Sequence, residues 1–128
     1  MKPEKFINIV EHRLDSCKTT LSSKAVEYSK DNDRLHNFKT AARIKGCTQI
    51  EALYGMWLKH IVSIQDMIEN AANGNFPSDK LIADKFNDNI NYTLLAEGIL
   101  VEEREAQGTS KYIIGGTHAW VNLGSTSF

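Results

Sequence analysis

The chain has 128 residues, of which 41% are hydrophobic and 24% are charged, and its formal net charge at pH 7 is −1. This composition is that of an ordinary globular protein and excludes an intrinsically disordered chain. The length predicts one domain whose core needs no disulfide or metal to hold it. Because the net charge is close to zero, we expect no direct binding to DNA, and any anion site must be a local cluster of basic residues.

Cysteine content and hydropathy indicate a cytoplasmic protein. Cys17 and Cys47 are too few for a disulfide framework, so we expect both thiols to be reduced. No apolar run approaches the roughly 20 residues that are needed to span a bilayer, which predicts no membrane partner. The N-terminal segment is too charged, and its apolar run is too short, for a secretory signal.

Apolar residues at alternating three- and four-residue steps predict a long amphipathic helix from Pro3 to Ser29. Their spacing is close to the heptad seam of a coiled coil. Asp33 is placed to cap a short second helix, which we expect from about Arg34 to Lys45 with Gly46 as its stop. The apolar positions of the first helix are Ile7, Val10, Leu14, Cys17, Leu21, Ala25 and Tyr28.

The stretch from Thr48 to Asn73 predicts a helix at the centre of the fold. Thr48 and Glu51 have the spacing of a capping box at its start, and Gly74 suits the left-handed turn after its end. Its apolar arc is wide, so this helix should be contacted on more than one side. A fourth helix is expected from the N-cap residue Ser78 to about Glu103.

The C-terminal tail has a different character from the rest of the chain. Ser110–Ile114 and Thr117–Leu123 are rich in β-forming residues, and Gly115 and Gly116 between them suit a two-residue hairpin turn. A lone hairpin is marginal in water, so we expect it to pack on the helices or on another copy of the chain. The sequence therefore predicts a mainly α protein of one domain, with a four-helix bundle over residues 1–107 and a C-terminal β-hairpin tail over residues 108–128.

Polar side chains lie on or beside the apolar stripe of each predicted helix. In a helical bundle, such groups can converge on one cleft from facing helices. Basic side chains there would contact phosphates, arginine as a bidentate fork and lysine as a point charge, and aromatic rings would stack on a base. The predicted ligand-binding residues are Lys24, Tyr28, Arg34, Asn37, Lys59, His60, Asn91 and Tyr92.

Several of these residues have an ordinary structural alternative. Lys24 and Glu27 have the spacing of a surface i,i+3 ion pair, which stabilises a helix only slightly. Lys59 and Asp66 are spaced to form a solvated ridge on the third helix. His60 lies where a histidine at the edge of the core would also be expected. These alternatives stay open at the level of the sequence.

The types of polar residue limit the chemistry. The sequence has no zinc-ligand spacing, no glycine-rich phosphate loop and no nucleophile elbow. Mg²⁺ is the one cofactor that the residues admit, because carboxylate oxygens can hold it against a substrate phosphate. The predicted metal ligands, if a metal binds, are Glu27, Asp66 and Asp88.

Four stretches of the chain resemble a family of small uncharacterised phage and prophage proteins. They are KAVEY from Lys24, DRLHNF from Asp33, KHIVSIQDM from Lys59 and DKFNDNINY from Asp84, so that the resemblance covers roughly residues 10–103. More distantly, the acid on the third helix and the Asp-x-x-Asn-Tyr pattern on the fourth are similar to the MazG-like, all-α NTP pyrophosphohydrolases. The resemblance implies a MazG-like helical bundle, usually oligomeric, with a nucleotide pocket at or near a subunit interface and Mg²⁺ held by acidic residues.

The chain departs from the pyrophosphohydrolase pattern at the acidic positions. Those enzymes carry Glu-Glu-x-x-Glu on one helix and Glu-x-x-Asp on the next. The corresponding stretches here read KHIVS from Lys59 and KFND from Lys85, so only Asp88 keeps its acid. Replacing acids by lysine and histidine turns a metal cradle into a direct phosphate cradle, which favours binding over hydrolysis.

Three functions follow from these observations. The first is a phage-type nucleotide-binding protein, a homo-oligomer in the host cytoplasm, which sequesters a phosphorylated nucleotide or a nucleotide-derived signal used in host defence. The second is a Mg²⁺-dependent NTP pyrophosphohydrolase or a nucleotide-modification enzyme with an atypical acid set. The third is an inhibitor of a host enzyme that acts through its surface, in which case the polar residues only fix the register of the helices.

Overall fold

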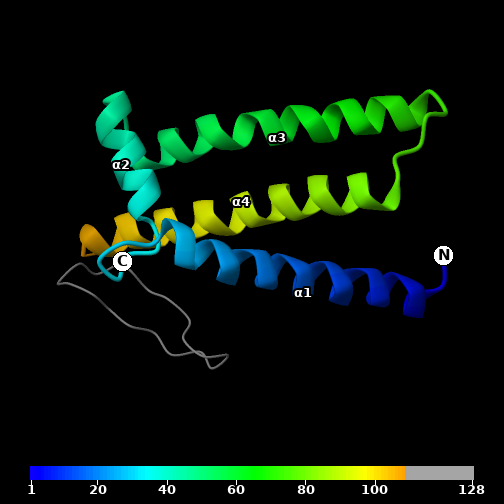
Figure 1. The fold of residues 1–128 in the computed structure, drawn as a ribbon, viewed down its shortest axis with the longest axis horizontal. Coiled ribbons are helices and arrows are strands. Elements are labelled where there is room, and N and C mark those ends of the chain that lie inside the picture. Colours follow the sequence, from blue (N-terminus) through cyan, green and yellow to red (C-terminus); the bar gives the residue numbers. More distant parts are fainter. Residues whose placement is uncertain (109–128) are drawn as a thin grey trace.

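Four helices make up the computed structural model, which describes residues 1–108 (Figure 1). They are α1 (Pro3–Tyr28), α2 (His36–Lys45), α3 (Gln49–Ala72) and α4 (Asp79–Ala106). The predicted mainly α fold and its four helices are confirmed. The predicted β-hairpin lies outside the described residues.

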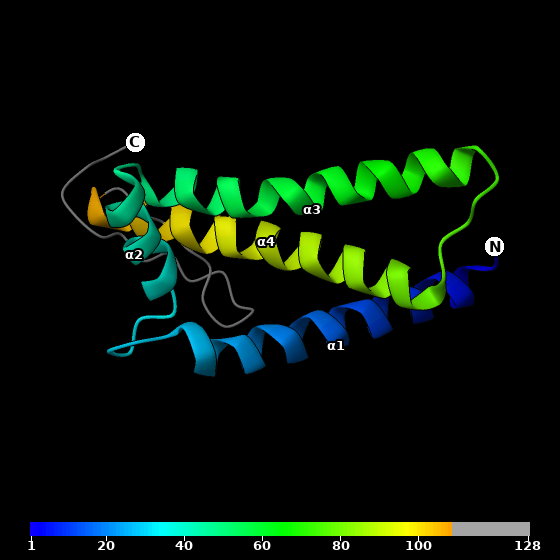
Figure 2. The same cartoon turned by 45° about the horizontal axis from the view of Figure 1, so that its top comes forward.

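The three long helices lie side by side, with α4 between α1 and α3 (Figures 1 and 2). α1 packs on α4, and α3 packs on the opposite side of α4. The short helix α2 crosses one end of this layer and packs on the start of α3. α4 is therefore the middle helix, and both α1 and α3 contact it.

The predicted helix ends of α3 and α4 are confirmed by their capping contacts. The backbone N–H of Glu51 donates to Oγ1 of Thr48 at 3.2 Å, and the Thr48 hydroxyl donates to Oε1 of Glu51 at 2.8 Å. Ser78 caps α4 in the same way, since its Oγ accepts from the N–H of Leu81 at 3.2 Å. Gly74 follows α3 with a φ of +89°, a conformation that glycine adopts at little cost.

The start of α2 differs from its prediction. The helix begins at His36 rather than at Arg34, and Asp33 is not its N-cap. Asp31 and Asn32 have left-handed φ values of 53° and 59°, which makes the chain turn tightly just before Asp33. Asp33 instead accepts a hydrogen bond from the N–H of Leu35 at 3.0 Å, so its carboxylate closes the turn that leads into the helix.

The most buried part of the core lies where α2, α3 and α4 meet. Leu35 and Phe38 pack there against Leu53 of α3 and Ile99 of α4. Lys39 adds an electrostatic clamp, because its Nζ lies 2.7 Å from Oδ2 of Asp33 and 2.9 Å from Oε1 of Glu102. The core thus holds α2 in place across the end of the layer.

The apolar seam of α1 is only partly covered. Cys17 is the only buried side chain of this helix within residues 1–108, whereas Ile7 and Leu14 are 53% and 54% exposed. α1 packs on α4 alone among the long helices, so one neighbour has to cover a seam that spans the whole helix. The amphipathic pattern predicted the helix correctly but not how much of its apolar side would be covered.

Candidate functional site

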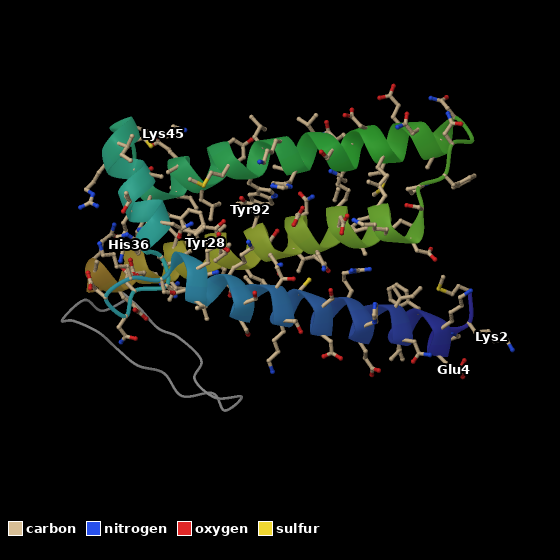
Figure 3. The ribbon with its side chains drawn as sticks, viewed as in Figure 1. Lys2, Glu4, Tyr28, His36, Lys45 and Tyr92 are labelled. Atoms are coloured by element: carbon tan, nitrogen blue, oxygen red, sulfur yellow. The ribbon has the colours of Figure 1, made fainter. Side chains whose placement is uncertain are left out.

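A cavity of about 440 Å³ lies at the end of the layer that α2 crosses. Side chains from α1, α3 and α4 and from the segment that includes the start of α2 line it. Figure 3 shows Tyr28 of α1 and Tyr92 of α4 at this end of the molecule, near His36. The predicted residues that line the cavity are Lys24, Tyr28, Arg34, Asn37, His60, Asp88, Asn91 and Tyr92, and the others are Thr20, Leu21, Phe38, Met56 and Leu95.

Three of the cavity side chains carry a buried polar atom that lacks a hydrogen-bond partner among residues 1–108. These atoms are Nη1 of Arg34, Oδ1 of Asn37 and Oδ1 of Asn91. Asn91 is only 7% exposed. A buried polar group without a partner costs roughly 1–3 kcal/mol, so three of them around one hollow make it a candidate site for water or a polar ligand.

The guanidinium of Arg34 carries an uncompensated positive charge in this cavity. Burial lowers the pKa of Arg34, because removal from water disfavours the charged form. Within the described part of the chain, no carboxylate forms an ion pair with it. Arginine nevertheless stays charged in proteins, so this side chain is suited to bind an anion.

The aromatic ring of Tyr92 packs between two other rings beside the cavity. The ring of Tyr92 lies nearly parallel to that of Trp57, with 6.5 Å between their centroids, and 5.0 Å from the ring of His60. Burial raises the pKa of Tyr92, and the nearby charge of Asp88 adds to this effect. The Tyr92 hydroxyl therefore stays protonated at neutral pH and is available as a neutral donor.

Asn89 was not predicted as part of the site, but its amide holds Trp57 of α3 against α4. Its Oδ1 accepts from Nε1 of Trp57 at 2.9 Å, and its Nδ2 donates to the backbone carbonyls of His60 and Lys85 at 3.0 Å and 2.9 Å. These bonds join α3 to α4 at the level of the cavity. An asparagine in mid-helix was the only signal for it in the sequence, because such a residue needs partners outside the helix.

His60 and Asp88 form the polar corner of the cavity. Nδ1 of His60 lies 3.3 Å from Oδ2 of Asp88, so the imidazole and the carboxylate orient each other. The pair links α3 to α4 and leaves the other carboxylate oxygen of Asp88 free to accept a hydrogen bond from a ligand. His60 was predicted as a ligand-binding residue with a structural alternative, and it lies at the edge of the core and lines the cavity.

Three predicted site residues lie outside the cavity. Lys59 and Asp66 are exposed on α3, about one-quarter turn or more away from the side on which His60 lies. Glu27 is also exposed, and its Oε2 pairs with Nζ of Lys24 at 2.8 Å. The surface-pair alternative for Lys24 and Glu27 is thus observed, although the same lysine also lines the cavity.

The three predicted metal ligands do not converge. Asp88 lines the cavity, whereas Glu27 and Asp66 lie on the exposed surfaces of α1 and α3. Residues 1–108 contain no group of three or more histidine, cysteine or acidic side chains placed to share a metal ion. This donor set does not fit the Mg²⁺ site that the pyrophosphohydrolase resemblance implies.

A second polar network, also absent from the predictions, positions α1 against α4. Oδ1 of Asn87 accepts a hydrogen bond from Nη1 of Arg13 at 2.8 Å, and its Nδ2 donates to Oγ of Ser16 at 2.7 Å. The thiol of Cys17 is directed to the same oxygen at 3.4 Å. This network fixes the helix that provides Lys24 and the other α1 residues of the cavity.

Comparison of the chain with protein-family models, with curated proteins and with solved structures gives no match. The cavity is therefore the feature from which a function can be inferred. In the part of the chain that the structure describes, no helix is both long and apolar enough to cross a lipid bilayer.

Proposed function

We propose that the protein binds a small phosphorylated nucleotide in this cavity. The observation that carries the proposal is the set of unpartnered buried atoms on Arg34, Asn37 and Asn91 around one hollow. A cavity of about 440 Å³ is within the size range of small-molecule sites. Its lining combines a cation, amide groups and aromatic rings, which are the groups that phosphate, base edges and base faces require.

Each part of the cavity suits one part of such a ligand. The free guanidinium of Arg34 would bind the phosphate by two parallel hydrogen bonds. The amide oxygens of Asn37 and Asn91 would accept hydrogen bonds from the N–H groups of a base. Tyr28 and Tyr92 offer ring faces for stacking, and such stacking is favourable for every base.

The charges around the cavity favour a ligand with one phosphate group. The other basic side chains there are already paired, Lys24 with Glu27 and His60 with Asp88. Asp88, which also lines the cavity, adds a negative charge. The extra charges of a triphosphate would meet only Arg34 and a shared lysine, so a nucleoside monophosphate or a phosphodiester is the better match.

Binding without hydrolysis agrees with the acid set. A Mg²⁺-dependent pyrophosphohydrolase needs carboxylates gathered around the phosphates, and only Asp88 is at the cavity. The phage-type role, in which the protein sequesters a nucleotide or a nucleotide-derived signal, is the form of this proposal that the sequence resemblance supports. Inhibition of a host enzyme through the surface would give the cavity no role.

The test is to identify and measure the ligand. The full chain is purified without added nucleotide, denatured, and its small-molecule extract is analysed by mass spectrometry. Calorimetric titrations with nucleoside mono- and triphosphates and cyclic nucleotides follow, in the absence of Mg²⁺. We expect a bound or titratable nucleotide, with the monophosphate or cyclic form binding more tightly than the triphosphate.

A matched pair of arginine variants gives the control. Arg34→Gln should lower the affinity roughly 10-fold or more, because it removes a charge-assisted contact. Arg43→Gln changes an exposed arginine of α2 that does not line the cavity and should leave the affinity unchanged. No bound nucleotide and no binding heat with any of the ligands would refute the proposed function.

A further inference from the structure

A broad apolar surface runs along α1 and α4 and borders the cavity at Leu21. Two adjoining grooves between these helices form it, one lined by Phe6, Ile9, Val10, Leu14, Ile82, Phe86 and Ile90, and the next by Leu14, Leu21 and Leu94. We call these side chains, together with the neighbouring Ile7, the α1/α4 face. The exposed large apolar side chains on it are Phe6, Ile7, Ile9, Val10, Leu14, Phe86 and Leu94.

This face is left open by the layered arrangement of the helices. α1 packs on one side of α4 and α3 on the other, so neither covers the edge where α1 and α4 meet (Figure 2). Arg13 is the one charged side chain that lines the first groove, and its guanidinium already donates to Oδ1 of Asn87 at 2.8 Å. That groove can therefore be covered without burying a charged group that has no hydrogen-bond partner.

The sequence of α1 indicates what kind of partner covers it. Ile7, Leu14 and Leu21 recur every seventh residue, with Val10 and Cys17 between them, which is the spacing of a seam that packs against another helix. Cys17 is buried at this seam, whereas Ile7 and Leu14 are 53% and 54% exposed. A second copy presents the same seam, and a twofold axis lets the two seams cover each other.

The amount of apolar surface is that of a stable interface. With about 200 Å² for a fully exposed large apolar side chain, the seven exposed residues leave roughly 650 Å² uncovered on each copy. A standard protein–protein interface buries about 800 Å² per partner, including its polar rim. Exposed apolar patches of this size on a single chain indicate an interaction site.

We infer that a second copy of this chain covers the α1/α4 face. In the resulting dimer, α1 and α4 of each copy pack against the same pair of the other copy and form an intermolecular four-helix bundle. The cavity is lined by α1 residues from Thr20 onward and the first groove by α1 residues up to Leu14, so a contact centred on the first groove leaves both cavities of the dimer open. The contact also stabilises the packing of α1 on α4 and so the position of the α1 residues that line each cavity.

The oligomeric state of the full chain tests this inference. Light scattering after size exclusion and sedimentation velocity over a wide concentration range should show a dimer. Leu14→Glu should weaken the dimer roughly 100-fold or more, because a twofold interface contains the substitution twice. Leu58→Glu, on the exposed side of α3, is the matched control, since Leu58 is 45% exposed and should leave the dimer intact.

Other outcomes would overturn the inference. A monomer at every concentration would mean that something else covers the face. A dimer lost in Leu58→Glu and kept in Leu14→Glu would place the interface on α3. If Leu14→Glu fails to fold, Ile7→Glu near the end of α1 takes its place, and the melting temperature of the unmodified chain gives a second readout. That temperature should rise with protein concentration if association stabilises the fold, and a constant value would count against the dimer.

Discussion

Replacing Asn91 by leucine separates a binding role of this residue from a structural one. Oδ1 of Asn91 is buried in the cavity wall and has no hydrogen-bond partner among the described residues. Leucine has a similar branched shape and no polar atom, so Asn91→Leu removes the cost of the unpartnered group. That cost is roughly 1–3 kcal/mol, so we expect the free energy of unfolding of the ligand-free protein to rise by about that amount.

The expected gain is large enough to measure by thermal unfolding followed by circular dichroism. For a domain of this size, each 1 kcal/mol shifts the melting temperature by roughly 4 °C or more. The same substitution should weaken nucleotide binding roughly 10-fold, because the amide is then missing from the site. A variant that is more stable and binds less well is the result expected of a residue kept for its ligand.

Asn87→Leu is the matched control, on the same helix and with the same change of side chain. The Asn87 amide is already bonded to Arg13 and Ser16, so its loss should destabilise the fold rather than stabilise it. If Asn91→Leu destabilises the protein as much as Asn87→Leu does, Asn91 is a structural residue. The cavity would then lose its main sign of an absent polar ligand.

Three further predictions concern the contacts around the site. Asn89→Ala should lower the free energy of unfolding by roughly 1–3 kcal/mol in urea melts, since it leaves the indole N–H of Trp57 without its partner; an unchanged midpoint would contradict this. The hydrogen bond from Lys39 holds the pKa of Asp33 below its ordinary value, so its contribution to stability is present above that ordinary pKa and lost as the pH falls through the folded value. The stability difference between the unmodified chain and Asp33→Asn should therefore be constant at neutral pH and shrink as the pH falls below about 4, and a difference that stays constant through the acidic range would show that the carboxylate charge is unimportant. Burial raises the pKa of Tyr92, so an ultraviolet titration should show a tyrosine that ionises above the ordinary range and that disappears in Tyr92→Phe; its survival in that variant would assign it to another residue.

The helix ends could be predicted because their causes are local. Thr48 with Glu51, Ser78, Gly46 and Gly74 act within a few residues of where they stand, so their types alone determine where the chain starts or leaves a helix. The predicted start of α2 was wrong because Asp33 takes part in the tight turn before the helix and does not cap the helix itself. Sequence patterns do not show which of two local structures wins.

The site could be predicted only as far as residue type narrows the choice. Arg34, Asn37 and Asn91 were chosen as polar residues beside apolar stripes, and the structure places all three at the cavity. Lys59 and His60 were both chosen as ligand-binding residues, yet neighbours on a helix point about 100° apart, and the structure places only His60 at the cavity. Tertiary packing determines which side of α3 faces α4, and the sequence pattern does not predict that side.

Three asparagines in five residues of the middle helix each have a different task. Asn87 joins α1, Asn89 joins α3, and Asn91 faces the cavity between them. Inserting or deleting one residue just before Asn87 would rotate all three by about 100° and break both helix contacts and the site together. A change of one side chain in this short stretch of α4 should therefore affect one contact, whereas a change in length should affect all three together, unlike a change of length in the loop before α4.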